Sequence, residues 1–147
     1  MIAGHDYQVV RFNPEKHGAF VYDSFRLSLR HQFPWCHVPA GILLDQLKRT
    51  LASPGTAALV AEVDVSDEPA DLIAGWCVGV PAGNEVVYGF TRYSMRRMGI
   101  GSTLALTAGV DLTKPVDVRY WTRAAERISK RPGYRLAFSI CGFEAAA

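Results

Sequence analysis

Three apolar runs follow one another in the middle of the chain and are joined only by short polar segments. They are TAALVAEVDV at 56–65, LIAGWCVGV at 72–80 and EVVYGFT at 85–91, with SDEPAD at 66–71 and PAGN at 81–84 between them. Such runs, bounded by turn residues, are typical of strands. Because connections this short join antiparallel neighbours, the centre of the chain predicts an antiparallel sheet.

Two helices are predicted ahead of this sheet, after a short strand at 7–13. The motif Asn-Pro-Glu at 13–15 places an N-cap residue, a first helical position and a first-turn acid in sequence, so a helix should run from there to about Arg30. Residues 40–52 carry apolar side chains close to the helical repeat and predict a second helix. Two prolines in HQFPWCHVP at 31–39 separate the helices.

The last third of the chain predicts further alternation of helix and strand. A helix from about Ile100 to Leu112, a strand at 116–121, a short basic helix at 122–130 and a strand at 134–143 complete the order β-α-α-β-β-β-α-β-α-β. A chain of 147 residues is the size of a single domain, here 1–147. The predicted fold class is therefore α/β of the α+β kind, with a central mixed sheet flanked by helices and a late βαβ unit.

Charge is unevenly distributed along the chain. The net charge is −4 over residues 1–91 and +7 over residues 92–135. This asymmetry favours an anionic partner for the C-terminal half, either a phosphate-bearing small molecule or a nucleic acid, and a solvated basic helix face is the alternative.

No apolar run approaches the ~20 residues of a membrane span, and three widely spaced cysteines form no metal or disulfide framework. We expect a cytoplasmic protein with no membrane contact and no metal.

The segment RYSMRRMGIGS at 92–102 joins the third strand of the predicted sheet to a helix. A helix N-terminus offers unpaired N–H groups and a partial positive charge, and the glycines Gly99 and Gly101 leave those groups accessible. Ser102 adds a hydroxyl, and the nearby arginines add charge. The segment therefore predicts a phosphate cradle. It lacks the Gly-Lys-Ser/Thr of a Walker loop and the third glycine of the dinucleotide fingerprint, and a tight turn without a ligand is the alternative.

These residues resemble the GNAT acetyltransferase superfamily. Arg96-x-x-Gly99-x-Gly101 is similar to the family motif [RQ]-x-x-G-x-[GA], and the predicted order of elements is similar to the family's order. A later family pattern is echoed between Thr122 and Tyr134. The segments at 22–30, 73–79 and 86–101 look most like those of phage-encoded GNAT-like proteins without an assigned substrate. The resemblance implies an acyl-CoA-dependent N-acyltransferase that moves an acetyl group from acetyl-CoA to an amine.

The resemblance also implies site residues. For the coenzyme they are Phe90, Thr91, Arg92, Arg96, Arg97, Met98, Gly99, Ile100, Gly101 and Ser102. The family's catalytic tyrosine, which protonates the coenzyme thiolate, falls on Ser129, so Ser129 is the candidate acid. Glu85 is the nearest carboxylate in sequence for the base, with a solvated turn residue as the alternative. Tyr88 is either core or catalytic, and Phe33, Trp35 and His37 are candidates to line the acceptor pocket.

A second hypothesis keeps the fold and drops the catalysis. A GNAT-like module could bind a protein or a nucleic acid through a basic stretch, which consists of Arg119, Arg123, Arg127, Lys130 and Arg131. The serine at position 129 favours this second hypothesis. The sequence leaves open the acceptor, which is a small-molecule or macromolecular amine, and the acyl group.

Overall fold

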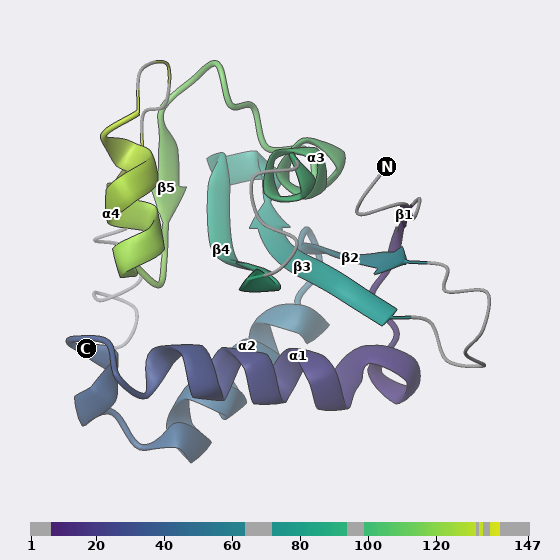
Figure 1. Ribbon diagram of the computed structural model, residues 1–147, viewed down its shortest axis with the longest axis vertical. Helices are drawn as coiled ribbons and strands as arrows, with labels where there is room; N and C mark the ends of the chain where they lie inside the picture. Colours follow the sequence, from purple (N-terminus) through teal and green to yellow (C-terminus); the bar gives the residue numbers. More distant parts are fainter. Residues whose placement is uncertain (1–6, 64–71, 94–98, 132, 134–135, 139–147) are drawn as a thin grey trace.

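A single mixed sheet of six strands organises the computed structural model of the protein (Figure 1). The structure describes residues 7–63, 72–93, 99–131, 133 and 136–138. The strands are ordered β1-β2-β3-β4-β5-β6 across the sheet, so sequence neighbours are also spatial neighbours. The prediction of a mixed sheet flanked by helices is confirmed.

The first four strands are antiparallel, and the short connections predicted this for the second, third and fourth. They are β1 (Tyr7–Arg11), β2 (Ala57–Val63), β3 (Leu72–Val80) and β4 (Glu85–Thr91). One glycine permits the close approach of β3 to β4: a Cβ on Gly75 would lie 2.5 Å from the carbonyl oxygen of Phe90. A glycine is therefore required at position 75.

The last two strands, β5 (Val116–Val118) and β6 (Leu136–Phe138), run parallel to β4 and to each other. β5 pairs with Glu85 and Val86 at the start of β4, and two backbone bonds follow, from Arg119 N–H to the oxygen of Val86 and from Tyr120 N–H to that of Val87. Among the described residues the pairing goes no further, although β4 continues to Thr91.

Helices cover both faces of the sheet (Figure 1). On one face α1 (Pro14–Leu29) and α2 (Ala40–Ala52) pack on a core that contains Phe25, Leu47, Trp76, Tyr88 and Tyr120. On the other face α3 (Ile100–Thr107) packs on a second core that contains Leu59, Cys77, Ile100 and Leu104. Successive residues of a strand face opposite sides, which is why Trp76 and Cys77 lie in different cores. The short helix α4 (Arg123–Ser129) lies beside β5.

The predicted helix starts are confirmed, and two predicted ends are wrong. The side chain of Asn13 accepts hydrogen bonds from the amides of Glu15 and Lys16, which is the expected N-cap. The third helix ends at Thr107 and not near Leu112, because Gly109 takes a left-handed φ of 89° that a helix cannot continue. Likewise β5 ends at Val118, three residues before the predicted strand end.

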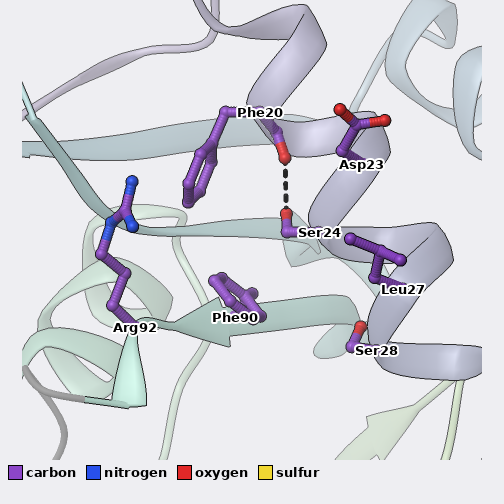
Figure 2. A pocket seen from close by; sticks show the side chains of 7 residues that line it. All are labelled: Phe20, Asp23, Ser24, Leu27, Ser28, Phe90 and Arg92. Atoms are coloured by element: carbon purple, nitrogen blue, oxygen red, sulfur yellow. Dashed lines mark hydrogen bonds between the residues drawn. The ribbon is translucent and has the colours of Figure 1, made fainter.

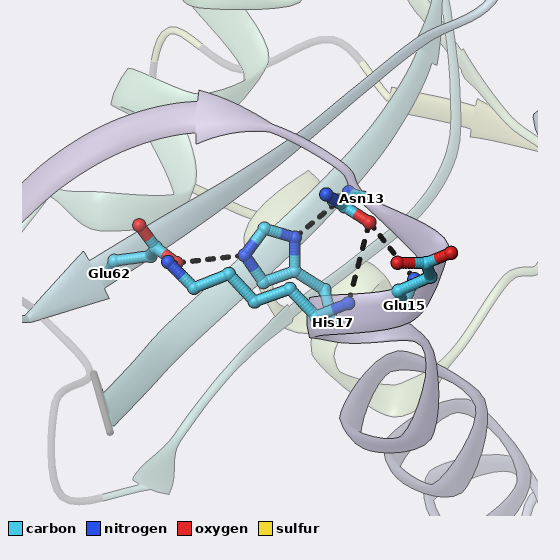
Figure 3. Close-up of polar contacts among 5 residues, drawn as sticks. Asn13, Glu15, His17 and Glu62 are labelled. Carbon is cyan, nitrogen blue, oxygen red and sulfur yellow. Dashed lines mark hydrogen bonds and ion pairs between the residues drawn. The ribbon is translucent and has the colours of Figure 1, made fainter. Parts of the chain in front are cut away.

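A buried polar cluster joins the start of α1 to β2 (Figure 3). The amide of Asn13 donates to Nδ1 of His17, so the ring proton lies on Nε2, which donates to Glu62 over 2.8 Å. The ammonium of Lys16 lies 2.9 Å from the same carboxylate oxygen. Burial raises the pKa of Glu62, but the hydrogen bonds and positive charge of its partners outweigh burial and leave that pKa below its usual value. Nothing in the sequence pattern predicts this long-range cluster.

Candidate functional site

No described side chain caps the N-terminus of α3. Gly99 is the N-cap, with a left-handed φ of 76°. Thr103 makes the first helical bond, to the oxygen of Gly99, and no acceptor for the amides of Ile100, Gly101 and Ser102 is found in the described part of the chain. A Cβ on Gly99 would meet nothing within 4 Å, and one on Gly101 would lie 3.9 Å from Thr91 Oγ1. The junction is neither filled by a described side chain nor closed by described backbone bonds.

Only part of the predicted coenzyme site falls within the described residues. Arg96, Arg97 and Met98 lie outside them. The side chain of Ile100 is buried in the second core, so only its backbone can face a ligand. Gly99 and Gly101 are exposed, and Ser102 is half-buried.

Arg92 places a positive charge at the end of β4. Its backbone amide and its Nε donate to the oxygens of Ala74 and Ile73, respectively. Its guanidinium lies over the ring of Phe20, 4.6 Å from the ring centre, and Phe20 in turn makes an edge contact with Phe90. These contacts fix the direction of the side chain, so the charge is held on the α1 side of the sheet, at the end of β4.

A groove of about 410 Å³ lies between α1 and the end of β4 (Figure 2). Five of its lining residues share one side of α1 and two come from the end of β4 and the residues after it; they are Phe20, Asp23, Ser24, Leu27, Ser28, Phe90 and Arg92. The volume falls within the range of small-molecule sites in proteins. The groove was not predicted, although the spacing i, i+3, i+4, i+7, i+8 from Phe20 is a recognisable helical stripe.

The predicted acceptor residues of the 31–39 segment do not line this groove. Trp35 belongs to the core, where its Nε1 donates to the oxygen of Trp121. Phe33 is 79% exposed and contacts the ring of His37. Trp76 is core as well, and its Nε1 donates to the hydroxyl of Ser24 beneath the groove.

Tyr88 lies in the aromatic core and reaches the groove through a serine. Its ring contacts those of Phe25, Trp76 and Tyr120. Its hydroxyl shares a 2.5 Å hydrogen bond with the hydroxyl of Ser28, which lines the groove. Of the two interpretations of Tyr88, the packing supports core, and the hydrogen bond places one polar atom of that core beside the groove.

The side chain of Glu85 forms an ion pair and is not that of a solvated turn residue. Its two carboxylate oxygens accept from Arg119 over 2.9 and 3.0 Å, and its side chain is only 13% exposed. Six residues separate Glu85 from Thr91, so the two lie about 20 Å apart along β4. The alternative of a solvated residue is therefore wrong, and the contacts give Glu85 a structural role at the end of the strand far from the α3 junction.

Ser129 and the basic stretch lie on or beside α4. The hydroxyl of Ser129 donates to the oxygen of Glu126 in the same helix, at 2.7 Å. Arg119 does not belong with the exposed basic residues, because it is held between Glu85 and Thr50. The remaining members of the stretch, Arg123, Arg127, Lys130 and Arg131, are exposed.

Comparison of the chain with protein-family models found no match, and comparison with curated proteins found none either. No helix in the described part of the chain is both long and apolar enough to cross a membrane. Among the residues that the structure describes, no three His, Cys, Asp or Glu side chains gather into a group that could hold a metal ion. Cys77 is buried, and burial raises the pKa of its thiol to about 12, whereas Cys36 is exposed.

Proposed function

We propose that the protein is an acyl-CoA-dependent N-acyltransferase of GNAT-like architecture. The observation that carries the proposal is the N-terminus of α3, where Gly99 and Gly101 carry no side chain and no described group accepts from the first helix amides. Helix amides of this kind bind phosphate oxygens, and the positive end of the helix dipole favours an anion.

The chemistry is a direct acyl transfer. The nitrogen of a neutral amine attacks the thioester carbonyl carbon, the carbon–sulfur bond breaks, and the coenzyme leaves as a thiolate that takes up a proton. Backbone N–H groups at Phe90 and Thr91 are the candidates to polarise the carbonyl. Because Glu85 is paired with Arg119, we assign the removal of the amine proton to water in the groove. Ser129 stays the candidate proton donor to the thiolate.

Acetyl-CoA binding tests the proposal directly. We expect acetyl-CoA and coenzyme A to raise the melting temperature and to give a saturable calorimetric titration, because a ligand that binds only the folded state stabilises it. Pantethine, which lacks the diphosphate, should give a much smaller effect. An absence of binding by acetyl-CoA at millimolar concentration would remove the proposal.

The exposed arginines of α4 favour a second candidate, a nucleic-acid-binding module without catalysis. Arg123 and Arg127 lie four residues apart and share one face of the helix, and Lys130 and Arg131 follow at its end. Binding through these residues should weaken steeply as salt is raised, because phosphate contacts release counterions. A fluorescent oligonucleotide that shows no salt-dependent binding excludes this candidate.

A further inference from the structure

The groove beside α1 lies at the margin of the first core. α1 buries Val21, Phe25 and Leu29 against the sheet. On the adjoining side of the helix Phe20 packs partly against the same core and also lines the groove, whereas Leu27 stays 44% exposed there. Phe20 and Leu27 therefore leave apolar surface in the groove for a ligand.

The lining of the groove favours a ligand with an apolar chain or ring. Its walls are formed by Phe20, Leu27 and Phe90. The hydroxyls of Ser24 and Ser28 already donate to backbone oxygens of α1, so they have little left to offer a polar ligand. Burial against these walls favours methylene or aryl groups at about 25 cal/mol per Å² of apolar surface.

The two charged lining residues lie at opposite ends of the groove (Figure 2). Asp23 is 68% exposed on the α1 side, where its contact with Arg26 is long, at 3.7 Å. Arg92 stands at the β4 side, over the ring of Phe20. A cationic group is attracted to the Asp23 end, whereas the nearby guanidinium disfavours the charged form of an amine at the other end.

We propose that this groove binds an apolar chain with a cationic head, with the head at Asp23 and the chain between Phe20, Leu27 and Phe90. Combined with the proposed transferase activity, on which this second step rests, the acceptor is an α,ω-diamine with an apolar spacer. One nitrogen stays an ammonium at Asp23, and the other reaches, at the Phe90 end of the groove, the thioester as the neutral nucleophile. A simple alkylammonium fills the same groove with its only nitrogen at the wrong end, so it binds and inhibits.

Binding to the free protein tests the groove without the coenzyme. Hexylammonium should bind saturably in a calorimetric or NMR titration, and hexanol, which lacks the charge, should bind more weakly. Asp23→Asn should weaken hexylammonium binding about two- to fivefold, which is the size found for exposed ion pairs. Asp45→Asn, on the exposed part of α2, is the matched control and should change nothing. Absence of binding, or equal binding by Asp23→Asn, overturns the groove site.

Turnover tests the assignment of the acceptor. With acetyl-CoA present, diaminoalkanes of three to seven methylenes should release free thiol, with a clear optimum in length, and hexylammonium should inhibit without being acetylated. Faster acetylation of hexylamine than of every diamine overturns the orientation, and competition between hexylammonium and coenzyme A assigns the groove to the coenzyme. If hexylammonium binds in an Asp23-dependent way but acetyl-CoA does not bind, the groove site stands and the transferase proposal fails.

Discussion

Replacing Gly101 should affect the stability of the free protein and coenzyme binding differently. Gly101 is the second residue of α3, and its added Cβ meets only Thr91 Oγ1 at 3.9 Å, which is ordinary contact. Alanine in place of glycine within a helix stabilises by about 0.5–1 kcal/mol. For a domain of this size that raises the melting temperature of the free protein by about 1–4 °C. A bulky side chain at this position would, however, stand among the amides of the proposed diphosphate site.

The ligand-induced shift supplies the second half of this prediction. At 100 times its dissociation constant a ligand stabilises the folded state by about 2.7 kcal/mol, which is roughly 5–11 °C. Because the motif accepts alanine at this position, we expect Gly101→Ala to keep most of that shift and Gly101→Leu to lose nearly all of it. Gly41→Leu is the matched control, because Gly41 is the second residue of α2 and its Cβ would meet nothing within 4 Å. A full coenzyme shift in Gly101→Leu would refute the cradle.

Three further predictions follow from packing and charge. Gly75→Ala should lower the free energy of unfolding, measured by urea denaturation, by about 1–3 kcal/mol, since its Cβ would lie 2.5 Å from a β4 oxygen. Gly89→Ala, whose Cβ would have its nearest atom at 4.0 Å, should change that free energy by no more than about 0.5 kcal/mol. Equal effects of the two substitutions would contradict the packing. The folded-state pKa of Glu62 lies below its usual value of 4.5, so the ionised carboxylate stabilises the fold above pH 4.5 and this stabilisation is lost as the pH falls further. In denaturation experiments at a series of pH values, the stability difference between wild type and Glu62→Gln should therefore shrink below pH 4.5. A constant difference would argue against this role of Glu62. Glu85→Gln should lower the free energy of unfolding by about 1–3 kcal/mol through loss of the Arg119 pair and leave kcat nearly unchanged, and a hundredfold fall in kcat of the folded variant would restore Glu85 as the base.

The sequence predicted the features that depend on local chemistry. Asn13 and Thr122 have side chains that satisfy helix amides within three residues of themselves, so the starts of α1 and α4 follow from residue type alone. Short connections likewise required antiparallel pairing of β2 with β3 and of β3 with β4.

The features that the sequence missed depend on residues far apart along the chain. The partner of Glu85 is Arg119, 34 residues later, and that of Glu62 is His17, 45 residues earlier. Neither distance can be read from a local pattern, so Glu85 was interpreted as a possible base. The groove was missed for a related reason: the residues from Phe20 to Ser28 have the same spacing as a core-facing stripe, and only the packing of the folded chain shows that they line a groove.

Polar contacts hold both ends of α1, so the side of the groove that this helix forms has a fixed position. At its start His17 is held by Asn13 and Glu62, and just beyond its far end Gln32 accepts from the amide of Arg123. A helix held at both ends does not move outward to admit a large ligand or inward to close over a small one. Selectivity among ligands should therefore depend on the fixed width of the preformed groove. A crystal structure with a ligand bound should superpose on the structure of the free protein along the whole of α1.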